Sequence, residues 1–296
     1  MVAVCPHAHG VAGARVHQDK QRAPVLDWAR YVDGDLNAGL ERLAREPAAQ
    51  SSNCTSLVDI GDYSLMLIDK PSVPASELRQ AVRWQVKDLL DFPIDDAVVD
   101  IFDVDAQSGN RIYAVAARSS HVRQRIEQLE QAGFDPRTVD IPEFAIRNIA
   151  ALLPEDAGGV GVINLGERDG LITLTRQDTL YLSRRIDVGS ERLLANGAVM
   201  SEQTEGLLDA IVIEVQRSLD YYESHFSQPP VQAVVVAPLA TEIPGMVDYL
   251  GAQLGVNVRS LDVNELLDTA EPLDQQTQFQ CLTAIGAALR DAGAAA

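Results

Sequence analysis

Three residues near the start of the chain could ligate a metal ion. Cys5, His7 and His9 alternate along a stretch that reads as a strand and its turn, and side chains two positions apart on a strand point to one side. Thiolate and imidazole are ligands that zinc prefers, so a partial zinc site is one interpretation. Pro6 and the lack of an obvious fourth ligand favour the other, an irregular turn without a metal. We expect the irregular turn.

The other polar residues form no familiar catalytic motif. The sequence has no P-loop, no Gly-x-Ser-x-Gly and no paired catalytic carboxylates. Ser, His and Asp residues are present, but no spacing links them into a triad. Arg184-Arg185 and Glu191-Arg192 read as solvated charges. The residues alone therefore predict no catalytic site.

Composition excludes several classes of partner. The net charge is −19 over 296 residues, whereas binding to nucleic acid or to anionic lipid needs a basic face. Three scattered cysteines make no disulfide framework and fit a reducing compartment. We see no signal peptide and no apolar run long enough to span a bilayer. We expect a cytoplasmic protein that reaches a membrane only through partners.

The elements that would position any site repeat between the two halves of the chain. Each half opens with three strands whose first turn ends in glycine, a residue that tolerates a positive φ. The expected strands are Val2–Val4, Val11–Val16 and Val25–Tyr31 in the first half, and Val160–Leu165, Leu171–Thr175 and Leu180–Ile186 in the second. A helix follows each set. This repetition predicts two related sheet-and-helix lobes.

A distinct segment, Pro71–Arg118, interrupts the first half. It predicts a helix with Ser76 as N-cap, followed by strands Ala97–Val104 and Arg111–Ala117 joined by a turn at 107–110. The apolar stripe of the helix recurs at helical spacing and comprises Leu78, Ala81, Val82, Val86, Leu89 and Leu90. We expect a compact helix-plus-hairpin insert.

Trp84 lies just beyond the edge of that stripe. Gln80 and Asp88 are among its polar neighbours on the helix. An exposed aromatic is typical of partner contacts, which makes these three residues a candidate partner surface. The other interpretation is that Trp84 packs against a neighbouring lobe. Gln85 falls inside the stripe, so we expect its amide to be buried and bonded to backbone.

Further elements follow from apolar spacing and from helix-ending glycines. They are helices through 122–132, Phe144–Leu153, 208–226, Pro244–Leu254 and Leu282–Leu289, and strands Val231–Val236 and Val256–Leu261.

Two long stretches resemble one family. "ELRQAVRWQVKDLLDFPIDDAVVDIFDV" from Glu77 and "RIYAVAARSSHVRQRIEQLEQAGFDPRTVDIPEFAIRNIA" up to Ala150 resemble the PilM/MshI group of actin-like pilus assembly proteins, with FtsA a more distant relative. The wording around Trp84–Asp100 is closest to MshI of the mannose-sensitive (MSHA) pilus system. Weaker matches, "VINLGERDGLITLTRQDTLYLSRRIDVG", "SLDYYES" and "CLTAIGAALR", extend the resemblance over most of the chain.

The resemblance implies an actin-like (ribonuclease H-like) α/β fold with two lobes and a small inserted α+β subdomain in the first lobe. The expected boundaries are 1–70 and 119–155 for the first lobe, 71–118 for the insert, 156–290 for the second lobe and 291–296 for a disordered tail.

The resemblance also places a nucleotide cleft between the lobes, and this sequence departs from the family pattern there. The first phosphate hairpin ends at Gly10 but lacks its acid. The second reads Asn164-Leu165-Gly166, followed by Glu167, with Asn in place of Asp. Ala237-Pro238 stands where a glycine pair would let a purine approach. We therefore expect a remnant cleft with no cofactor, the alternatives being ATP/Mg binding without hydrolysis and an active ATPase switch.

The implied function is that of a cytoplasmic scaffold. PilM-type proteins sit on the inner face of the inner membrane, and the expected partner is a PilN/MshJ-like bitopic protein whose N-terminal peptide docks between the first lobe and the insert. The rivals are the ATPase switch, an FtsA-like membrane-anchored filament and the cytoplasmic domain of a GspL-like secretion protein. The last residues carry no amphipathic helix, and no membrane helix follows, which argues against these last two.

Overall fold

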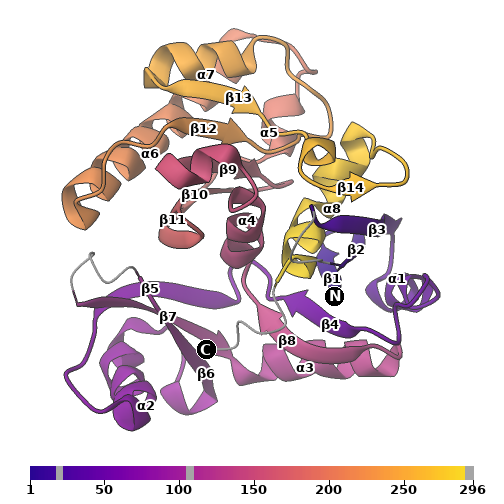
Figure 1. The fold of residues 1–296 in the computed structure, drawn as a ribbon, viewed down its shortest axis with the longest axis vertical. Coiled ribbons are helices and arrows are strands. Elements are labelled where there is room, and N and C mark those ends of the chain that lie inside the picture. Colours follow the sequence, from indigo (N-terminus) through magenta and orange to yellow (C-terminus); the bar gives the residue numbers. More distant parts are fainter. Residues whose placement is uncertain (18–22, 105–109, 291–296) are drawn as a thin grey trace.

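The computed structural model describes residues 1–17, 23–104 and 110–290. The expected turn at 107–110, apart from Asn110, and the expected tail at 291–296 lie outside the described residues. The described chain forms two large sheets and one small sheet, with helices packed on them (Figure 1).

The first large sheet has the order β14-β3-β2-β1-β4-β8. An antiparallel meander of β1 (Val2–His7), β2 (Gly10–His17) and β3 (Val25–Asp33) continues into the parallel strands β4 (Asn53–Leu57) and β8 (Asp135–Asp140). Side chains alternate across β1, as a strand requires. Val2 and Val4 face helices α1 (Leu36–Leu43) and α3 (Ser119–Gln131), whereas Ala3 and Cys5 face the centre of the molecule.

The second large sheet repeats this plan in the order β11-β10-β9-β12-β13. Its meander is β9 (Val160–Leu165), β10 (Gly170–Arg176) and β11 (Thr179–Ile186), and its parallel strands are β12 (Ala233–Val236) and β13 (Asn257–Ser260). The outer face is covered by α6 (Glu202–Phe226) and α7 (Met246–Leu254), and α5 (Ser190–Leu194) follows the meander. The two sheets thus have the same strand order, which confirms the predicted relation between the halves.

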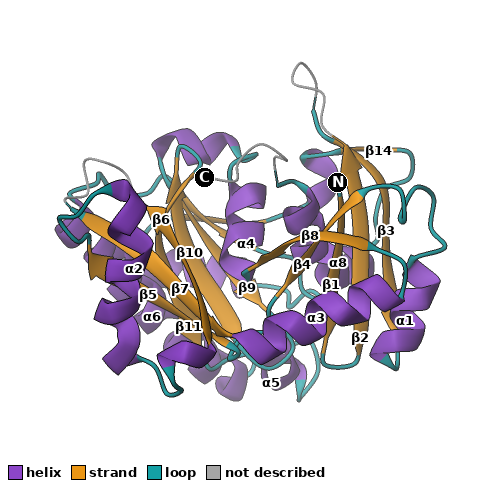
Figure 2. Cartoon of the chain, turned by 90° about the horizontal axis from the view of Figure 1, so that it is seen from below, coloured by secondary structure: helices purple, strands orange, loops and turns teal. Residues whose placement is uncertain are grey.

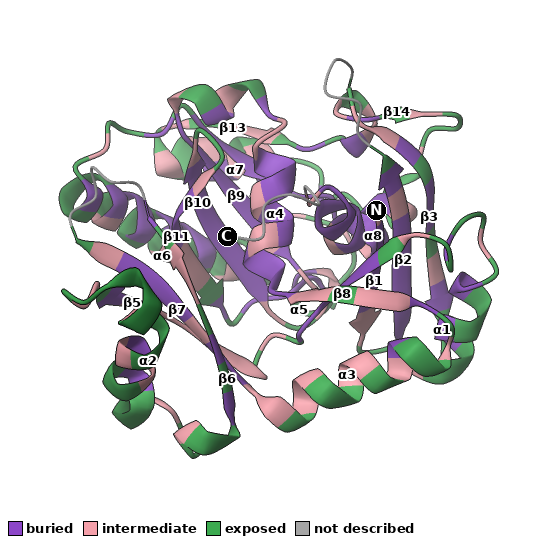
Figure 3. Ribbon diagram, turned by 60° about the horizontal axis from the view of Figure 1, so that its bottom comes forward, coloured by how far each residue is buried: buried purple, intermediate pink, exposed green. Residues whose placement is uncertain are grey.

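Two helices lie between the sheets (Figure 2). Residues of α4 (Pro142–Ala150) and α8 (Gln275–Ala288) share one apolar cluster with the inner faces of both sheets. Both helices are largely buried, whereas most residues of α2 (Ala75–Val86) and α3 are exposed or half-buried (Figure 3). Because α4 and α8 fill the interior, they fix how the two lobes sit against each other.

The small sheet has the order β5-β7-β6 and carries α2 (Ala75–Val86) on one face. Its strands are β5 (Tyr63–Asp69), β6 (Ala97–Asp103) and β7 (Arg111–Arg118), and two 3₁₀ turns, Lys87–Leu89 and Ile94–Asp96, follow α2. The sheet takes in β5, so this unit begins before residue 71, where we expected the insert to start.

The second lobe also ends earlier along the chain than expected. After the 3₁₀ turn Val263–Glu265, the short strand β14 (Asp268–Thr269) pairs with β3 of the first sheet. Helix α8 then packs on that sheet, and its first residue precedes the expected start at Leu282 because Asp274 caps it by accepting from Thr277 N–H. The segment after about residue 263 therefore packs with the first lobe.

Several local expectations were wrong. Ser76 is not the N-cap of α2, since the helix begins at Ala75 after Pro74 without a side-chain cap. Leu89 is 61% exposed and lies outside the apolar stripe. Gln85 is exposed, although its amide does donate to the carbonyl of Asp69 (3.2 Å). Gly10 does not have a positive φ; a Cβ there would lie 2.3 Å from the carbonyl oxygen of Val32.

The longest helix of the described chain, α6, has one buried face and one charged face. Among the described residues, no helix combines the length and apolar character that crossing a bilayer demands.

Candidate functional site

The first turns of the two meanders lie close together, one from each lobe. The β1–β2 turn carries His9, and the β9–β10 turn carries Glu167. The second turn is braced by the start of α5, because Ser190 N–H donates to the carbonyl of Gly166 (2.8 Å) and Glu191 N–H to that of Glu167 (3.0 Å). Gly189 permits this approach, since a Cβ there would lie 2.3 Å from the carbonyl oxygen of Glu167.

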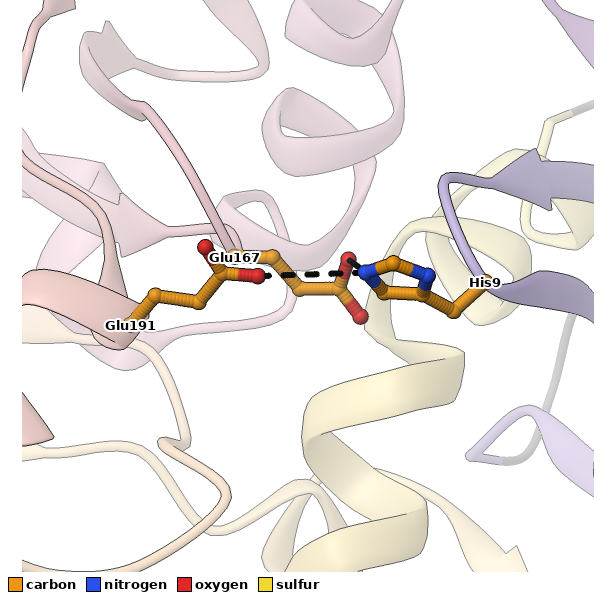
Figure 4. Close-up of side chains that lie close together, drawn as sticks. All are labelled: His9, Glu167 and Glu191. Carbon is orange, nitrogen blue, oxygen red and sulfur yellow. Dashed lines mark ion pairs between the residues drawn. The ribbon is translucent and has the colours of Figure 1, made fainter. Parts of the chain in front are cut away.

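His9, Glu167 and Glu191 form a cluster between the lobes (Figure 4). The Nε2 atom of His9 lies 4.0 Å from Oε2 of Glu167 and 3.9 Å from Oε1 of Glu191. The side chain of Glu167 is 25% exposed, whereas those of His9 and Glu191 are more than half exposed. Sequence analysis missed this cluster because Glu191 reads as a solvated charge until the fold brings α5 against the second turn.

Cys5 and His7 do not join His9, so the alternative interpretation of these three residues as one zinc ligand set is wrong. Cys5 lies in the apolar core, where burial raises the pKa of its thiol. Burial lowers the pKa of His7 to about 4, and its ring contacts Tyr31 edge-on. Of these three residues, only His9, in the turn beyond β1, belongs to a group of potential metal ligands among the described residues.

The expected nucleotide contacts are spread over the cleft. Gly10 is buried against β3, Asn164 is half-buried near the end of β9, and Gly166 lies in the second turn. None of these three lines either of the two pockets described below. Of the six expected residues, only Glu167 belongs to the cluster described above.

Ala237 and Pro238 line a separate pocket of about 450 Å³ at the ends of β12 and β13. Its acidic lining residues are Glu242, Asp248, Asp262 and Glu265, and no Lys or Arg is among the residues that line it. A phosphate entering this pocket would meet like charge without a compensating cation. The geometry therefore offers an apolar wall for a ring but no counter-charge for phosphates.

The larger hollow, of about 720 Å³, is the groove between the small sheet and the first lobe. Strands β6 and β8 line its two sides, and each lies at the edge of its own sheet. Helix α4 and the two residues that follow α8, Leu289 and Arg290, also line the groove. Edge strands leave backbone N–H and C=O groups available for pairing with an added strand.

Apolar and basic side chains alternate around this groove. Phe102 of β6 contacts Phe144 of α4, with ring centroids 4.5 Å apart, and the guanidinium of Arg147 lies 5.3 Å from the Phe144 ring centroid. Arg147 donates to Asp178 (2.7 Å), and Arg290 donates to Asp140. Burial raises the pKa of the Asp140 carboxyl, and Arg290 partly offsets that rise. The groove thus combines apolar side chains with three arginines (Arg137, Arg147 and Arg290) and three aspartates (Asp100, Asp140 and Asp178), and two of these arginines pair with aspartates of the groove.

Trp84, Gln80 and Asp88 lie elsewhere. Trp84 is 64% exposed, so the interpretation that it packs against a lobe is wrong, and Nζ of Lys87 stands 5.7 Å from its ring centroid. None of the three residues lines the groove. The role of Trp84, Gln80 and Asp88 in partner binding remains a prediction. Sequence analysis did not identify the groove residues Arg147 and Arg290, because only the fold brings them together.

Comparisons with known proteins agree with this geometry. Residues 65–205 match the family model described as type IV pilus assembly protein PilM. The structure of a PilM-PilN type IV pilus biogenesis complex is 19% identical over 97% of this chain and 97% of that chain, with a TM-score of 0.76. The cytoplasmic domain of EpsL, an inner membrane component of the type II secretion system of Vibrio cholerae, is 12% identical over 96% and 94%, with a TM-score of 0.54. Curated proteins gave no match. The predicted actin-like fold is confirmed.

Proposed function

We propose that this actin-like chain, which is PilM-like over residues 65–205, is a scaffold of type IV pilus assembly that holds an N-terminal cytoplasmic peptide of a PilN-like inner-membrane protein. The groove between β6 and β8 is the observation that carries the proposal. The similar structure is described as a PilM-PilN complex, which supports a partner of this kind. Docking would recruit the chain to the inner membrane peripherally.

The chemistry of the groove defines the peptide that it would take. An extended segment can pair its backbone with an edge strand while alternate side chains enter pockets. The rings of Phe102 and Phe144 suit an apolar side chain, and the arginines of the groove suit an acidic or amide side chain. More specifically, we propose that this chain is MshI-like, belongs to the MSHA pilus system and has an MshJ-like partner.

We propose further that the cleft does not work as an ATPase. The acidic lining of the 450 Å³ pocket and the two glutamates beside the second turn support this, because a phosphate group would meet negative charge at either place. The alternative, an ATP-driven switch, predicts a heat of binding for Mg-ATP together with phosphate release. Calorimetry and a phosphate assay on the purified chain distinguish the two.

Peptide docking is tested by titrating a synthetic N-terminal peptide of a PilN-like protein into the chain and into two variants of β6. Phe102→Glu puts a carboxylate among the apolar side chains of the groove, so it should weaken binding at least about tenfold. Val98→Glu makes the same change on the same strand at a side chain that is 47% exposed and outside the groove. Equal weakening by both changes, or no binding by the unaltered chain well above micromolar peptide, would contradict the proposal.

A further inference from the structure

The cluster of His9, Glu167 and Glu191 offers one nitrogen and two carboxylate oxygens to a single point between the lobes (Figure 4). All three ligand atoms lie within 4.8 Å of one another. A mixed set of one imidazole and two carboxylates is a donor set used for Zn²⁺ and other first-row divalent ions. Because it includes a histidine, this cluster differs from the exposed pairs of acidic residues that are common on acidic protein surfaces.

The distances nearly suit a bound ion. Metal–ligand bonds of about 2.0–2.2 Å in a tetrahedral site hold neighbouring ligand atoms roughly 3.4 Å apart. The observed 3.9 and 4.0 Å separations from the His9 nitrogen therefore need to close by only about half an ångström. His9 and Glu191 are more than half exposed, so side-chain rotation can supply that movement. Water would complete the coordination.

The local charge also favours a cation. Among the described residues, His9 is the ion-pair partner of both Glu167 and Glu191, and no arginine or lysine pairs with either. Two carboxylates held together on a chain of net charge −19 repel each other unless a positive charge intervenes.

The backbone holds two of the ligands in fixed relation. The hydrogen bond from Glu191 N–H to the carbonyl of Glu167 (3.0 Å) joins α5 to the β9–β10 turn, and Gly189 allows the close contact. His9 comes from the β1–β2 turn of the other lobe. The two glutamates therefore form one half of the site, and the histidine forms the other.

From this arrangement we propose that a divalent transition-metal ion, with Zn²⁺ as the type case, binds to His9, Glu167 and Glu191 and bridges the two lobes. The ion occupies the point where the two meander turns meet and fixes their separation without a nucleotide. This role is independent of peptide docking in the groove, because none of the three ligands lines the groove.

The test uses the full chain without a polyhistidine tag, first treated with a chelator and then titrated with Zn²⁺. Unaltered protein should bind one ion per chain, and His9→Ala or Glu191→Gln should weaken binding at least about tenfold. His17→Ala is the matched control, because His17 is also exposed and instead contacts Asp27 (3.0 Å). Glu223→Gln on α6 is the control for the carboxylate.

Two further readouts separate this site from binding elsewhere. Absorption spectra with Co²⁺ should show nitrogen and oxygen ligation and no thiolate charge-transfer band, since Cys5, Cys54 and Cys281 are buried. Zn²⁺ should raise the melting temperature of the unaltered chain and of His17→Ala, but not that of His9→Ala. Circular dichroism of metal-free His9→Ala checks that the variant folds.

Three results would overturn the proposal: no stoichiometric binding up to high micromolar Zn²⁺, equal affinity for His9→Ala and His17→Ala, or thiolate bands with Co²⁺. Failure here leaves the docking proposal standing, because the peptide titration does not involve these residues.

Discussion

At the residue scale, one buried carboxyl joins three parts of the molecule. Glu143 of α4 is 2% exposed and accepts from the hydroxyl of Tyr63 on β5 (2.6 Å) and from that of Ser183 on β11 (3.4 Å). Burial raises the pKa of Glu143, and the bond from Tyr63 partly offsets that rise. The small sheet, the central helix and the second lobe therefore meet at a single acidic group.

Removing the Tyr63 hydroxyl tests this junction. Tyr63→Phe leaves a buried carboxyl oxygen without its closest donor, so the free energy of unfolding should fall by about 1–3 kcal/mol at neutral pH. Urea unfolding measures the change. Tyr249→Phe is the control, because its hydroxyl donates to exposed Asp209 (2.6 Å) and its loss should matter little. Equal losses of unfolding free energy in the two variants would mean that the hydrogen bond from Tyr63 to Glu143 contributes no more to stability than an exposed one.

The pH dependence of stability follows from the same carboxyl. Because the pKa of Glu143 is raised in the folded state, the folded state holds the proton more tightly than the unfolded state does. The resulting contribution to the free energy of unfolding is fully present below the ordinary pKa of 4.5. It is lost as pH rises through the folded pKa. Unaltered protein should therefore lose stability relative to Glu143→Gln as the pH rises above 4.5 and through the folded pKa of Glu143.

Urea curves at a series of pH values measure the difference between the two proteins. Asp140, whose pKa burial also raises, is common to both, so its contribution cancels. A constant difference across the range would contradict the raised pKa of Glu143.

At the element scale, the contact between α4 and α8 determines the centre of the molecule. A Cβ at Gly286 of α8 would lie 2.2 Å from the carbonyl oxygen of Ala145 on α4. The carbonyl of Gly286 also accepts from the side-chain amide of Asn148 (2.8 Å). The two helices approach this closely only because residue 286 has no side chain.

Gly286→Ala should therefore destabilise the chain by about 1–3 kcal/mol, since the helices must move apart. Gly206→Ala on α6 is the matched control. Gly206 is helical, and a Cβ added there would have no neighbouring atom within 4 Å, so alanine should stabilise by up to about 1 kcal/mol. Thermal and urea unfolding measure both, and the two changes should have opposite signs. A stable Gly286→Ala would mean that the contact relaxes without cost.

Sequence patterns predicted the meander strands of the second lobe well, but they did not predict β14 or β5. β9 matches its expected limits, Val160–Leu165, because a buried apolar run bounded by glycines has few other interpretations. β14 is two residues long and exists only because β3 is there to pair with it. β5 is bounded by Gly61 and Pro71, but its membership of the small sheet depends on long-range pairing with β7, which no local pattern predicts.

At the scale of the whole molecule, duplication predicted that two turns meet, but not which side chains they bring together. His9 and Glu167 lie in those turns, so sequence reasoning reached them. Glu191 enters because the start of α5 folds back on the second turn, a contact made through backbone hydrogen bonds that no side-chain pattern encodes. Sequence analysis did not predict the groove for a similar reason, since the strands that line it, β6 and β8, belong to two different sheets.

Net charge is a property of the whole chain, and it predicts how salt changes stability. The chain has 43 Asp and Glu against 24 Lys and Arg, so the compact state carries self-repulsion that the expanded state relieves. The Debye length falls from about 30 Å at 0.01 M salt to about 10 Å at 0.1 M. Screening should therefore raise the melting temperature with NaCl, mostly below about 0.2 M.

Ion pairs act in the opposite direction, because salt weakens pairs such as Arg259 with Glu155 (2.7 Å). Exposed pairs contribute only about 0–1 kcal/mol each, whereas repulsion among 19 uncompensated charges is spread over the whole surface, so the melting temperature should rise. Thermal melts in NaCl with a chelator present measure this without interference from divalent ions. A fall in melting temperature over the same range would mean that specific pairs outweigh the net charge.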